Sequence, residues 1–568
     1  MKRLVAFPLP VATAFLSLCL MACSGGSDET GLGGSDFEPF CDTDLDCAEG
    51  STSECAVSTC DVIDGLCVTT PLPEGTPCDD NAGVCRDGFC AQTELKAYVK
   101  SPSPEPNALF GTSVSILGDR MIVGSPSSGP PFGRAAVFQR VNGEWSVAQQ
   151  IDTPRLPGGA TDGLFAWGVA SANEFFAVSA VGFNLGGTGS ARIFRLRNGQ
   201  WLMDTTFGNL GRIVGADAEP LDLFGTSIAL TPAGDTLVVG APGHTTKPEL
   251  PDRLAFADRD YSGAAYIFES GLWTETALLK ASNTGGTYEC IPCEEFACPT
   301  SGEGDGFGVA VAISGDTVVV GAPGEGSADT GVNADEDDDS APGAGAAYVF
   351  ERIDDTWEQT AYLKASNTDG EDRFGFAVAI EGDMIVVGAE REDSGEVDNQ
   401  GDNSAIDAGA AYVFERMGGV WEQTQYLKAS NVDAGFFFGA TLTMSDTTLV
   451  VGSPGESSIG GPDSGAAYVF TLVDGAWAQT NFYKAFNADA EAAFAGPPGT
   501  VAFSEPDSLI FCKTQTTLKG ASLSLAGDTL VIGTPYEDSA AIGVNGVPTS
   551  NAIPNSGAVY IFDNSEGQ

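Results

Sequence analysis

The sequence predicts an all-β fold, a seven-bladed β-propeller of four-stranded antiparallel blades. Three observations support this prediction. The chain of 568 residues contains 73 glycines and no long helical pattern. One sequence unit recurs seven times at an average spacing of about 68 residues. The unit is also divided between the two ends of the propeller segment, which we place at residues 91–568. A closed ring of four-stranded units accounts for all three observations.

The clearest copy of the unit predicts four strands. It begins at Phe307 with FGVAVAISGDTVVVGAPGEG and continues over 345–367 as GAAYVFERIDDTWEQTAYLKASN. The second part recurs over 409–431 as GAAYVFERMGGVWEQTQYLKASN. The apolar runs VAVAI and TVVVGA flank a Gly-Asp turn and therefore predict a β-hairpin. The runs GAAYVFER and WEQTAYLKA predict two more strands, so each unit forms one antiparallel blade.

Seven copies can be counted from their first residues. A Phe-Gly pair opens five of them, a degenerate FAWG at Phe165 opens another, and the last is expected to start at Leu518 without a phenylalanine. The five Phe-Gly copies start at Phe110, Phe224, Phe307, Phe374 and Phe438. An Asp or Asn marks the first turn of every copy, at Asp119, Asn173, Asp235, Asp316, Asp383, Asp446 and Asp528.

The two ends of the chain each carry part of a unit. The segment QTELKA (92–97) matches only the last third of the unit, and SGAVYIFDNSEGQ (556–568) contains its third strand and then stops. A ring brings these two fragments together. We therefore expect a strand from the N-terminal side to complete blade 7, which also hides a sheet edge that could pair with other chains.

The first forty residues resemble an export signal and a tether. Lys2 and Arg3 precede a long apolar run, so residues 1–22 are expected to be a signal peptide. The stretch Leu20-Met21-Ala22-Cys23 resembles the bacterial lipobox, which implies lipidation of Cys23. Residues 23–40 then form a flexible tether. Because serine follows the cysteine, the resemblance implies a place at the bacterial outer membrane or cell surface. An ordinary secretory signal is the alternative.

Most of the 14 cysteines are expected to form disulfides, because an exported chain meets an oxidising environment. Eight fall within residues 41–90 and predict a small disulfide-rich module: Cys41, Cys47, Cys55, Cys60, Cys67, Cys78, Cys85 and Cys90. A zinc site is the weaker alternative, since this segment has no CxxC pair and no histidine. Four more lie in two insertions, where a metal or redox motif is the alternative to two disulfides: Cys290, Cys293, Cys298 and Cys512. The spacing leaves the pairing open.

The net charge excludes one class of partner. Seventy-eight carboxylates against 26 basic side chains give a formal charge of −52. Such a surface repels phosphate backbones, so nucleic-acid binding is not expected. No second apolar run is long enough to span a bilayer, and membrane contact is expected through the N-terminal lipid alone. Divalent cations or cationic partners would instead be attracted.

The Phe-Gly and Gly-Ala-Pro pairs resemble FG-GAP repeats, the family found in the seven-bladed propeller of integrin alpha chains. Phe224-Gly225 is followed by GAP at 240–242, and Phe307-Gly308 by GAP at 321–323. The resemblance implies binding of proteins or glycans at a cell surface. In one respect this chain departs from the family: a short SGDT or AGDT turn stands where the family has its calcium loop. The family's cation sites therefore cannot be transferred to it.

Long acidic insertions are expected on one face of the propeller, in the connections after the second strands. The run 335–339 is DEDDD, and blade 5 carries further aspartates between 393 and 407. Oxygen ligands of this kind suit calcium, the one candidate cofactor. A solvated acidic loop is the alternative interpretation. The candidate calcium ligands are Asp335, Asp337, Asp339, Asp398 and Asp402.

The sequence favours a binding protein over an enzyme. His244 is the only histidine, it lies in a loop, and no GxSxG motif accompanies it. The prediction is a lipid-anchored surface protein that binds an extracellular protein or glycan, in the manner of an adhesin. A structural platform for surface assembly is the first alternative. A carbohydrate-active propeller enzyme is the weaker one, because carboxylates are too abundant here to single out a pair.

Overall fold

The structure is a computed structural model. It describes the backbone of residues 56–61, 66–71, 77–78, 83–86 and 89–92. It describes both backbone and side chains of residues 95–126, 133–154, 163–181, 187–206, 211–245, 261–283, 304–397, 399–458, 462–487, 492–496, 522–546, 548 and 551–563. No helix in these residues is long and apolar enough to cross a membrane. The chain divides into two compact units, Met1–Leu72 and Pro73–Gln568.

The cysteine-rich segment contains two small antiparallel sheets. The first unit holds β1 (Ala56–Asp61) and β2 (Leu66–Pro71), in which the backbone of Cys60 lies opposite that of Cys67. The second unit begins with a three-stranded sheet of β3 (Pro77–Cys78), β4 (Gly83–Arg86) and β5 (Phe89–Gln92). The segment predicted to be a disulfide-rich module therefore contains β-strands within residues 56–92.

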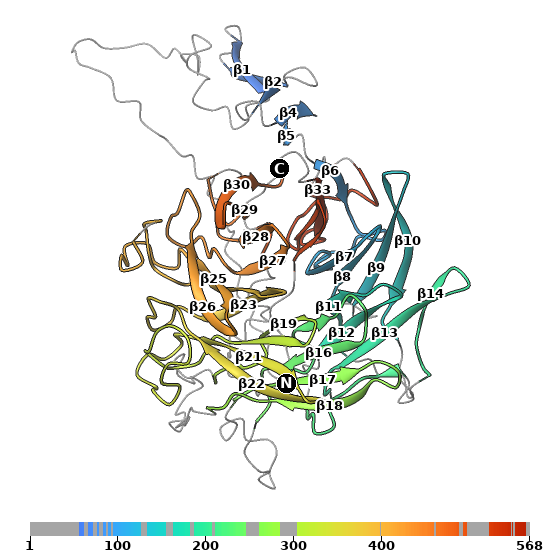
Figure 1. Cartoon of the computed structure of the whole chain (residues 1–568). Helices are drawn as coiled ribbons and strands as arrows, with labels where there is room; N and C mark the ends of the chain where they lie inside the picture. Colours follow the sequence, from blue (N-terminus) through green and yellow to red (C-terminus); the bar gives the residue numbers. More distant parts are fainter. Residues whose placement is uncertain are drawn as a thin grey trace, which may run out of the picture. The chain divides into compact units, whose positions relative to one another are not determined.

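The rest of the described chain forms seven four-stranded antiparallel sheets arranged as the blades of a propeller (Figure 1). The first strand of each blade contacts the first strands of both neighbouring blades, and the contact between the first and last of them closes the ring. This confirms the predicted seven-bladed fold. The first strands are β7 (Ser113–Leu117), β11 (Leu164–Ser171), β15 (Ile228–Leu230), β19 (Ala310–Ser314), β23 (Phe374–Glu381), β27 (Thr441–Ser445) and β31 (Leu523–Ala526).

The second and third strands form the middle of each blade, where alternating aliphatic and aromatic side chains are buried between neighbouring sheets. The second strands are β8 (Arg120–Ser125), β12 (Phe175–Val181), β16 (Thr236–Ala241), β20 (Thr317–Ala322), β24 (Met384–Ala389), β28 (Thr448–Ser453) and β32 (Thr529–Thr534). The third strands are β9 (Arg134–Val141), β13 (Ser190–Arg197), β17 (Ala264–Glu269), β21 (Ala346–Ile353), β25 (Ala410–Met417), β29 (Ala466–Val473) and β33 (Ala558–Asp563).

The fourth strands lie at the outer edge and alternate exposed with partly buried side chains over most of their length. In blades 1 to 6 each follows its own third strand. In blade 7 the fourth strand is β6, which precedes blade 1 in the chain. The fourth strands are β10 (Glu144–Asp152), β14 (Gln200–Met203), β18 (Thr274–Leu279), β22 (Thr356–Leu363), β26 (Val420–Leu427), β30 (Ala476–Tyr483) and β6 (Leu95–Val99).

The N-terminal strand closes the ring as predicted. β6 pairs antiparallel with β33, and Tyr98 lies opposite Tyr560. The register shifts between Ile561 and Phe562. The same shift occurs at the corresponding place in blades 3 to 6, between Val349 and Phe350 in blade 4 for example. β6 therefore reproduces the local geometry of an ordinary fourth strand and is part of the blade.

The Phe-Gly pair has a packing role that explains its recurrence. The ring of Phe374 is buried and lies 5.3 Å from Tyr412 and 6.1 Å from Phe414 of its own blade. Gly375 has φ +90, which side chains rarely tolerate. If Gly321 of the preceding blade carried a Cβ, that atom would lie only 1.9 Å from the carbonyl oxygen of Gly375. Glycine at both positions lets the backbones of two blades touch.

The start of blade 7 was predicted wrongly. The missing phenylalanine is Phe494, whose ring is 5.3 Å from Tyr560 in the same edge-on arrangement as Phe374 and Tyr412. Phe494 also pairs with Gly465, just as Phe374 pairs with Gly345. Blade 7 therefore opens at Phe494 rather than Leu518. The long segment between Phe494 and β31 separates the two parts of the motif, which hid it in the sequence.

Candidate functional site

The two faces of the propeller differ in the length of their connections. Turns between first and second strands, and between third and fourth strands, are short, as at 315–316 and 354–355. Connections between second and third strands, and from one blade to the next, are long, as at 323–345, 390–409 and 535–557. We call the side with the long connections the loop-rich face and the other the plain face. This confirms the predicted division.

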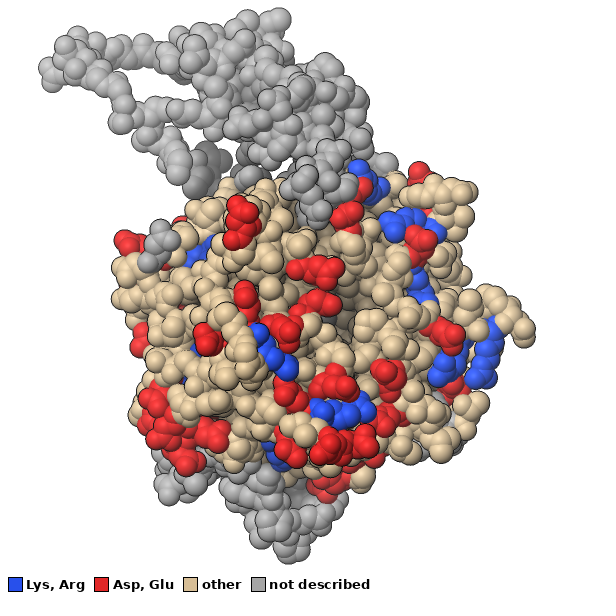
Figure 2. Space-filling view, viewed as in Figure 1, with Lys and Arg blue, Asp and Glu red and all other residues tan. Residues whose placement is uncertain are grey.

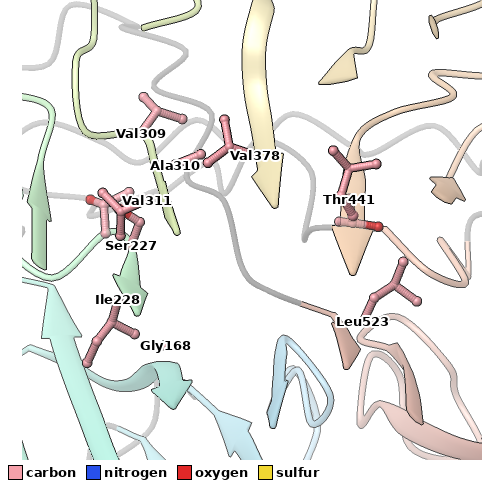
Figure 3. Close-up of a pocket in the computed structure, with 11 residues that line it drawn as sticks. Gly168, Ser227, Ile228, Val309, Ala310, Val311, Val378, Thr441 and Leu523 are labelled. Atoms are coloured by element: carbon pink, nitrogen blue, oxygen red, sulfur yellow. The ribbon is translucent and has the colours of Figure 1, made fainter. Parts of the chain in front are cut away.

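The central hollow of the ring is lined by the first strands of several blades (Figure 3). Methyl and hydroxyl groups make up its wall, and none of the described residues that line it carries a titratable side chain. General acid–base catalysis needs a titratable side chain, so these lining residues supply neither a general acid nor a general base. The lining residues are Gly168, Thr226, Ser227, Ile228, Val309, Ala310, Val311, Val378, Thr441, Leu442 and Leu523.

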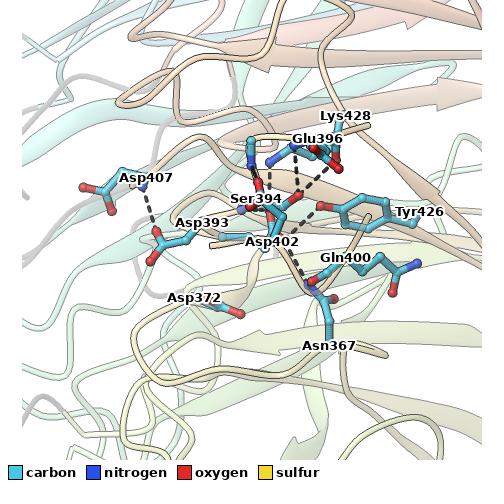
Figure 4. A network of polar contacts seen from close by, with 12 residues as sticks. Asn367, Asp372, Asp393, Ser394, Glu396, Gln400, Asp402, Asp407, Tyr426 and Lys428 are labelled. Carbon is cyan, nitrogen blue, oxygen red and sulfur yellow. Dashed lines mark hydrogen bonds and ion pairs between the residues drawn. The ribbon is translucent and has the colours of Figure 1, made fainter. Parts of the chain in front are cut away.

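Beneath the loop-rich face of blade 5 lies a buried polar cluster centred on Glu392. Lys428, at the end of β26, donates from Nζ to Glu392 Oε2 at 2.7 Å. Asn367, from the end of blade 4, donates from Nδ2 to Oε1 at 2.9 Å, and Tyr412 donates from its hydroxyl to Asn367 Oδ1 at 2.8 Å. Tyr426 adds a further hydrogen bond to Oε1 (Figure 4). The cluster thus joins two consecutive blades.

The same four residue types recur at the same places in four blades, and we call each set a Lys–Glu–Asn–Tyr cluster. In each, the Asn comes from the preceding blade, the Glu from the loop after the second strand, and the Tyr from the third strand. In blade 7 the lysine is Lys100, which follows the closing strand β6. The other sets are Lys364, Glu325, Asn283 and Tyr348 in blade 4; Lys484, Glu456, Asn431 and Tyr468 in blade 6; Lys100, Glu537, Asn487 and Tyr560 in blade 7.

Burial dominates the electrostatics of these clusters. The side chains of Lys428 and Glu392 are 0% and 2% exposed. Burial lowers the pKa of all four cluster lysines, while the paired glutamate acts in the opposite direction. Burial also raises the pKa of Tyr412 far above its usual range, so its hydroxyl remains a proton donor. Each cluster is a buried lysine–glutamate ion pair to which the asparagine and tyrosine are hydrogen-bonded.

Blade 3 has a variant of the cluster. Lys280 keeps the lysine position and donates to His244 Nδ1 at 3.0 Å, so histidine stands where the other blades have glutamate. Asp217 takes the asparagine position and accepts a 2.8 Å hydrogen bond from Tyr266. Although partial burial raises the pKa of Asp217, hydrogen bonds from Tyr266 and His244 bring it below its ordinary value. In blade 3 the carboxylate therefore comes from Asp217, in the segment before the blade, and not from the loop after the second strand.

The acidic loops rest on these clusters and use their carboxylates to order their own backbone. In blade 4, Asp335 Oδ1 accepts from the backbone N–H of Asp337 at 3.2 Å. Hydrogen bonds from the Ala328 backbone and the Ser340 hydroxyl lower the pKa of Asp338. These hydrogen bonds connect the two ends of the loop and one of its turns.

Blade 5 repeats this arrangement with Asp402. Hydrogen bonds from the Ser404 hydroxyl and from the backbone of Gly395 lower the pKa of its carboxyl group. The loop also docks on the preceding blade, since Ser366 donates to Gln400 Oε1 at 2.5 Å and Asn367 donates to the Gln400 carbonyl at 3.0 Å. The acidic loops of blades 4 and 5 are therefore ordered parts of the loop-rich face.

The four predicted calcium ligands that the structure describes are divided between two loops. Asp335, Asp337 and Asp339 are exposed in the blade 4 loop, and Asp402 lies in the blade 5 loop. Asp398 lies outside the described residues. Across the part of the chain that the structure describes, no three His, Cys, Asp or Glu side chains come together as a metal site. Calcium binding stays a prediction.

One buried carboxylate was missed by the sequence reasoning. Asp372 precedes the Phe-Gly pair of blade 5 and is 3% exposed. Burial, together with the negative charges of Glu392, Asp369 and Asp393, raises its pKa to about 8. Figure 4 shows Asp372 near Asp393 and Asn367. The repeat carried a signal for it, because an aspartate stands two residues before the Phe-Gly pair in blades 3, 4 and 5, and all three are buried: Asp222, Asp305 and Asp372.

The clusters themselves had a visible signal. The stretch YLKASN occurs in blades 4 and 5, and a glutamate follows the second strand in both. The sequence reasoning assigned these residues to strands and turns but did not pair them, since the partners lie in different blades. His244 was expected to be an ordinary loop histidine, whereas it occupies the glutamate position of blade 3.

The remaining predicted sites fall outside what the structure describes. Cys23 and the signal peptide do so. For Cys60, Cys67, Cys78, Cys85 and Cys90 only the backbone is described. The other cysteines expected in disulfides lie outside the described residues: Cys41, Cys47, Cys55, Cys290, Cys293, Cys298 and Cys512. These sites stay predictions.

The surface of the propeller is acidic. Figure 2 shows Asp and Glu over much of the visible face, with Lys and Arg mostly beside them. Several of the basic side chains form ion pairs, such as Arg416 with Glu351 at 2.7 Å. Among the charged groups on this face, acidic ones predominate, in line with the composition.

Comparison with known proteins identifies the repeat. The sequence profile described as FG-GAP repeat matches residues 207–268, 301–350, 357–414 and 421–470. The chain therefore carries FG-GAP repeats, and the resemblance is confirmed over that part. A search of curated proteins finds no match.

Solved structures with a similar fold include the WD40 repeats of RRP9, at 8% identity and a TM-score of 0.42, with 82% of this chain and 96% of that chain covered. A periplasmic gluconolactonase from Pseudomonas aeruginosa matches at 10% identity and a TM-score of 0.38, with 78% and 95% covered. A hypothetical selenium-binding protein from Sulfolobus tokodaii matches at 10% identity and a TM-score of 0.38, with 64% and 75% covered. These similarities say nothing of function.

Proposed function

We propose that this chain, whose residues 207–470 carry FG-GAP repeats, is a lipid-anchored surface protein that binds an extracellular protein or glycan through the loop-rich face. The propeller fold supports a ligand-binding or structural role in general terms. The observation that carries the finer proposal is the asymmetry of the ring: one face has ordered, elaborated loops and the other has short turns. Loops that vary in length on a rigid scaffold are where binding residues usually lie.

The path of the chain into the propeller is consistent with binding on the loop-rich face. β6 begins at Leu95 on the plain face and runs to Lys100 at the loop-rich face. The chain therefore enters the propeller from the plain face.

Binding can be tested with matched charge variants on the two faces. The mature chain would be applied to glycan and protein arrays, alongside Asp335→Asn/Asp337→Asn on the loop-rich face. The control is Asp354→Asn/Asp355→Asn, which removes two carboxylates from a turn of the plain face. Both control residues have positive φ, which asparagine tolerates. Loss of a ligand with the first variant alone supports the proposal.

Two outcomes would contradict the proposal. If the plain-face variant weakens binding and the loop-rich variant does not, the site has been assigned to the wrong face. If no ligand is found and the chain instead associates with itself, the structural alternative is favoured. Turnover of a polysaccharide by the purified chain would contradict the proposed absence of catalysis.

Calcium is proposed as an accessory ligand of the acidic loops. Extracellular calcium modules bind at roughly 10⁻⁴–10⁻³ M. The test is thermal unfolding with millimolar calcium and with a chelator, for the wild type and the Asp335→Asn/Asp337→Asn variant. A rise in Tm with calcium that the variant lacks supports the site. An equal Tm in both conditions removes calcium from the proposal.

A further inference from the structure

We propose that the Lys–Glu–Asn–Tyr clusters are sites of spontaneous amide cross-links, in which the lysine Nζ attacks the asparagine Cγ and ammonia leaves. Each bond would join the fourth strand of one blade to the end of the preceding blade. The four pairs are Lys364 with Asn283, Lys428 with Asn367, Lys484 with Asn431, and Lys100 with Asn487. This modification is independent of which ligand the loop-rich face binds.

The first argument is that one carboxylate holds both reacting groups. In blade 5, Glu392 Oε2 accepts from Lys428 Nζ at 2.7 Å, while Oε1 of the same group accepts from Asn367 Nδ2 at 2.9 Å. The amine and the carboxamide are therefore each held on one oxygen of the same carboxylate before reaction. Fixing two reactants in this way removes much of the entropic barrier to a bimolecular step.

The second argument concerns the carbonyl that would be attacked. Asn367 Oδ1 accepts a 2.8 Å hydrogen bond from the Tyr412 hydroxyl. The corresponding distances are 2.5 Å in blade 4 and 2.7 Å in blade 6. As the amine adds, negative charge develops on this oxygen. A donor already aimed at it stabilises that charge, as in an oxyanion hole.

The third argument is the state of the lysine. Lys428 is 3% exposed as a residue, and burial lowers the pKa of its amine. A desolvated lysine is a better nucleophile because more of it is neutral. The glutamate beside it is placed to take the proton.

The step balances without any further reagent. Glu392 takes a proton from the Lys428 ammonium, and the freed Nζ lone pair forms a bond to Asn367 Cγ. The bond from Cγ to Nδ2 then breaks as the carboxyl group gives its proton to the leaving nitrogen, and the regenerated carboxylate takes a second proton from Nζ. A lysine ammonium and a primary carboxamide become a secondary amide and ammonia, and the remaining proton stays on Glu392 or leaves with the ammonia as ammonium. No oxidant, metal or water is consumed.

Blade 3 provides a comparison within the same chain. Asp217 replaces the asparagine, and its ionised carboxylate is a poor electrophile. His244 replaces the glutamate and uses Nδ1 as an acceptor for Lys280. We therefore expect no cross-link in blade 3, although its lysine and tyrosine are in place.

The experiment is mass spectrometry of the purified full-length chain with its cysteines reduced and alkylated. Each bond removes one ammonia, so the expected loss is about 17 Da per site and about 68 Da for four. Proteolysis should yield branched peptides that link Lys428 to Asn367, and equivalent peptides for the other three pairs. An unbranched peptide for every cluster lysine would overturn the proposal.

The matched variants are Glu392→Gln and Glu422→Gln. Glu422 is exposed on β26, so its variant should keep all four bonds. Glu392→Gln should lack only the bond between Lys428 and Asn367, and the three remaining branched peptides would report that the ring has folded. If the bond forms unchanged in Glu392→Gln, the assigned role of the carboxylate is wrong. If that variant fails to fold, the wild-type peptides alone decide the proposal.

Discussion

Blades 5 and 3 place a lysine at the same point of the fold but satisfy it in different ways. Lys428 is buried and depends on the charged Glu392. Lys280 is only partly buried and shares its protons among His244, Ser262 and the Gly263 carbonyl. A fully buried cation needs a charged partner, whereas a partly hydrated one can use neutral acceptors. The repeat therefore conserves geometry while its chemistry varies with burial.

The largest expected effect comes from removing the acceptor of each lysine. Glu392→Ala leaves Lys428 buried without its counter-charge and should lower the free energy of unfolding by about 3–5 kcal/mol. His244→Ala should cost only about 1 kcal/mol, because Lys280 keeps its other acceptors. Urea unfolding of both variants measures the difference. Equal losses would show that burial does not distinguish the two blades.

The next effect is a pH dependence that belongs to blade 5. Asp372 has a pKa of about 8 in the folded protein, against about 3.9 in an unfolded chain. Between these values only the folded state holds the proton, so its contribution to stability is complete below about pH 4 and is lost as pH rises toward 8. Asp372→Asn cannot titrate and should remove this decline.

The measurement is Tm near pH 5 and near pH 9 for the wild type, for Asp372→Asn and for the control Asp433→Asn. Asp433 is exposed in the next connection and should leave the decline unchanged. The Tm of Asp372→Asn should exceed that of the wild type by more near pH 9 than near pH 5. The same gain in the control would assign the pH dependence to overall charge rather than to the buried site.

The smallest effect concerns the two tyrosines. Tyr412→Phe leaves Asn367 Oδ1 unsatisfied under blade 5 and should cost about 1–2 kcal/mol. Tyr266→Phe should cost less than about 1 kcal/mol, since the side chain of Asp217 is 53% exposed and water can replace the lost donor. Thermal unfolding of each variant against the wild type shows which one loses more stability. The reverse order would mean that hydration of Asp217 is not available.

Most of the architecture could be predicted because it depends on local repetition. The period, the Gly-Asp turns and the divided unit at 92–97 and 556–568 predicted seven blades and their closure. The loop lengths predicted the loop-rich face. The error at Phe494 has a physical reason: a long connection separates it from β31, and alanine replaces the usual glycine after it.

The polar clusters could not be predicted in the same way, because their members meet only across blades. Asn367 and Glu392 come from different blades, and Lys100 is separated from Glu537 by nearly the whole propeller. Prediction of such sites needs the packing of neighbouring sheets, whereas the acidic loops were visible as runs of charge.

The closing strand also determines the order in which the molecule can be completed. Of the propeller strands, β6 is synthesised first, yet its partner β33 is synthesised last. Blade 7 cannot form until the last strand has been made, and contacts between distant segments form slowly because they close a very large loop. Until then the hydrogen-bonding edge of β6 is open to other chains. A chain of this design is most exposed to mispairing in the interval between the synthesis of its first strand and that of its last.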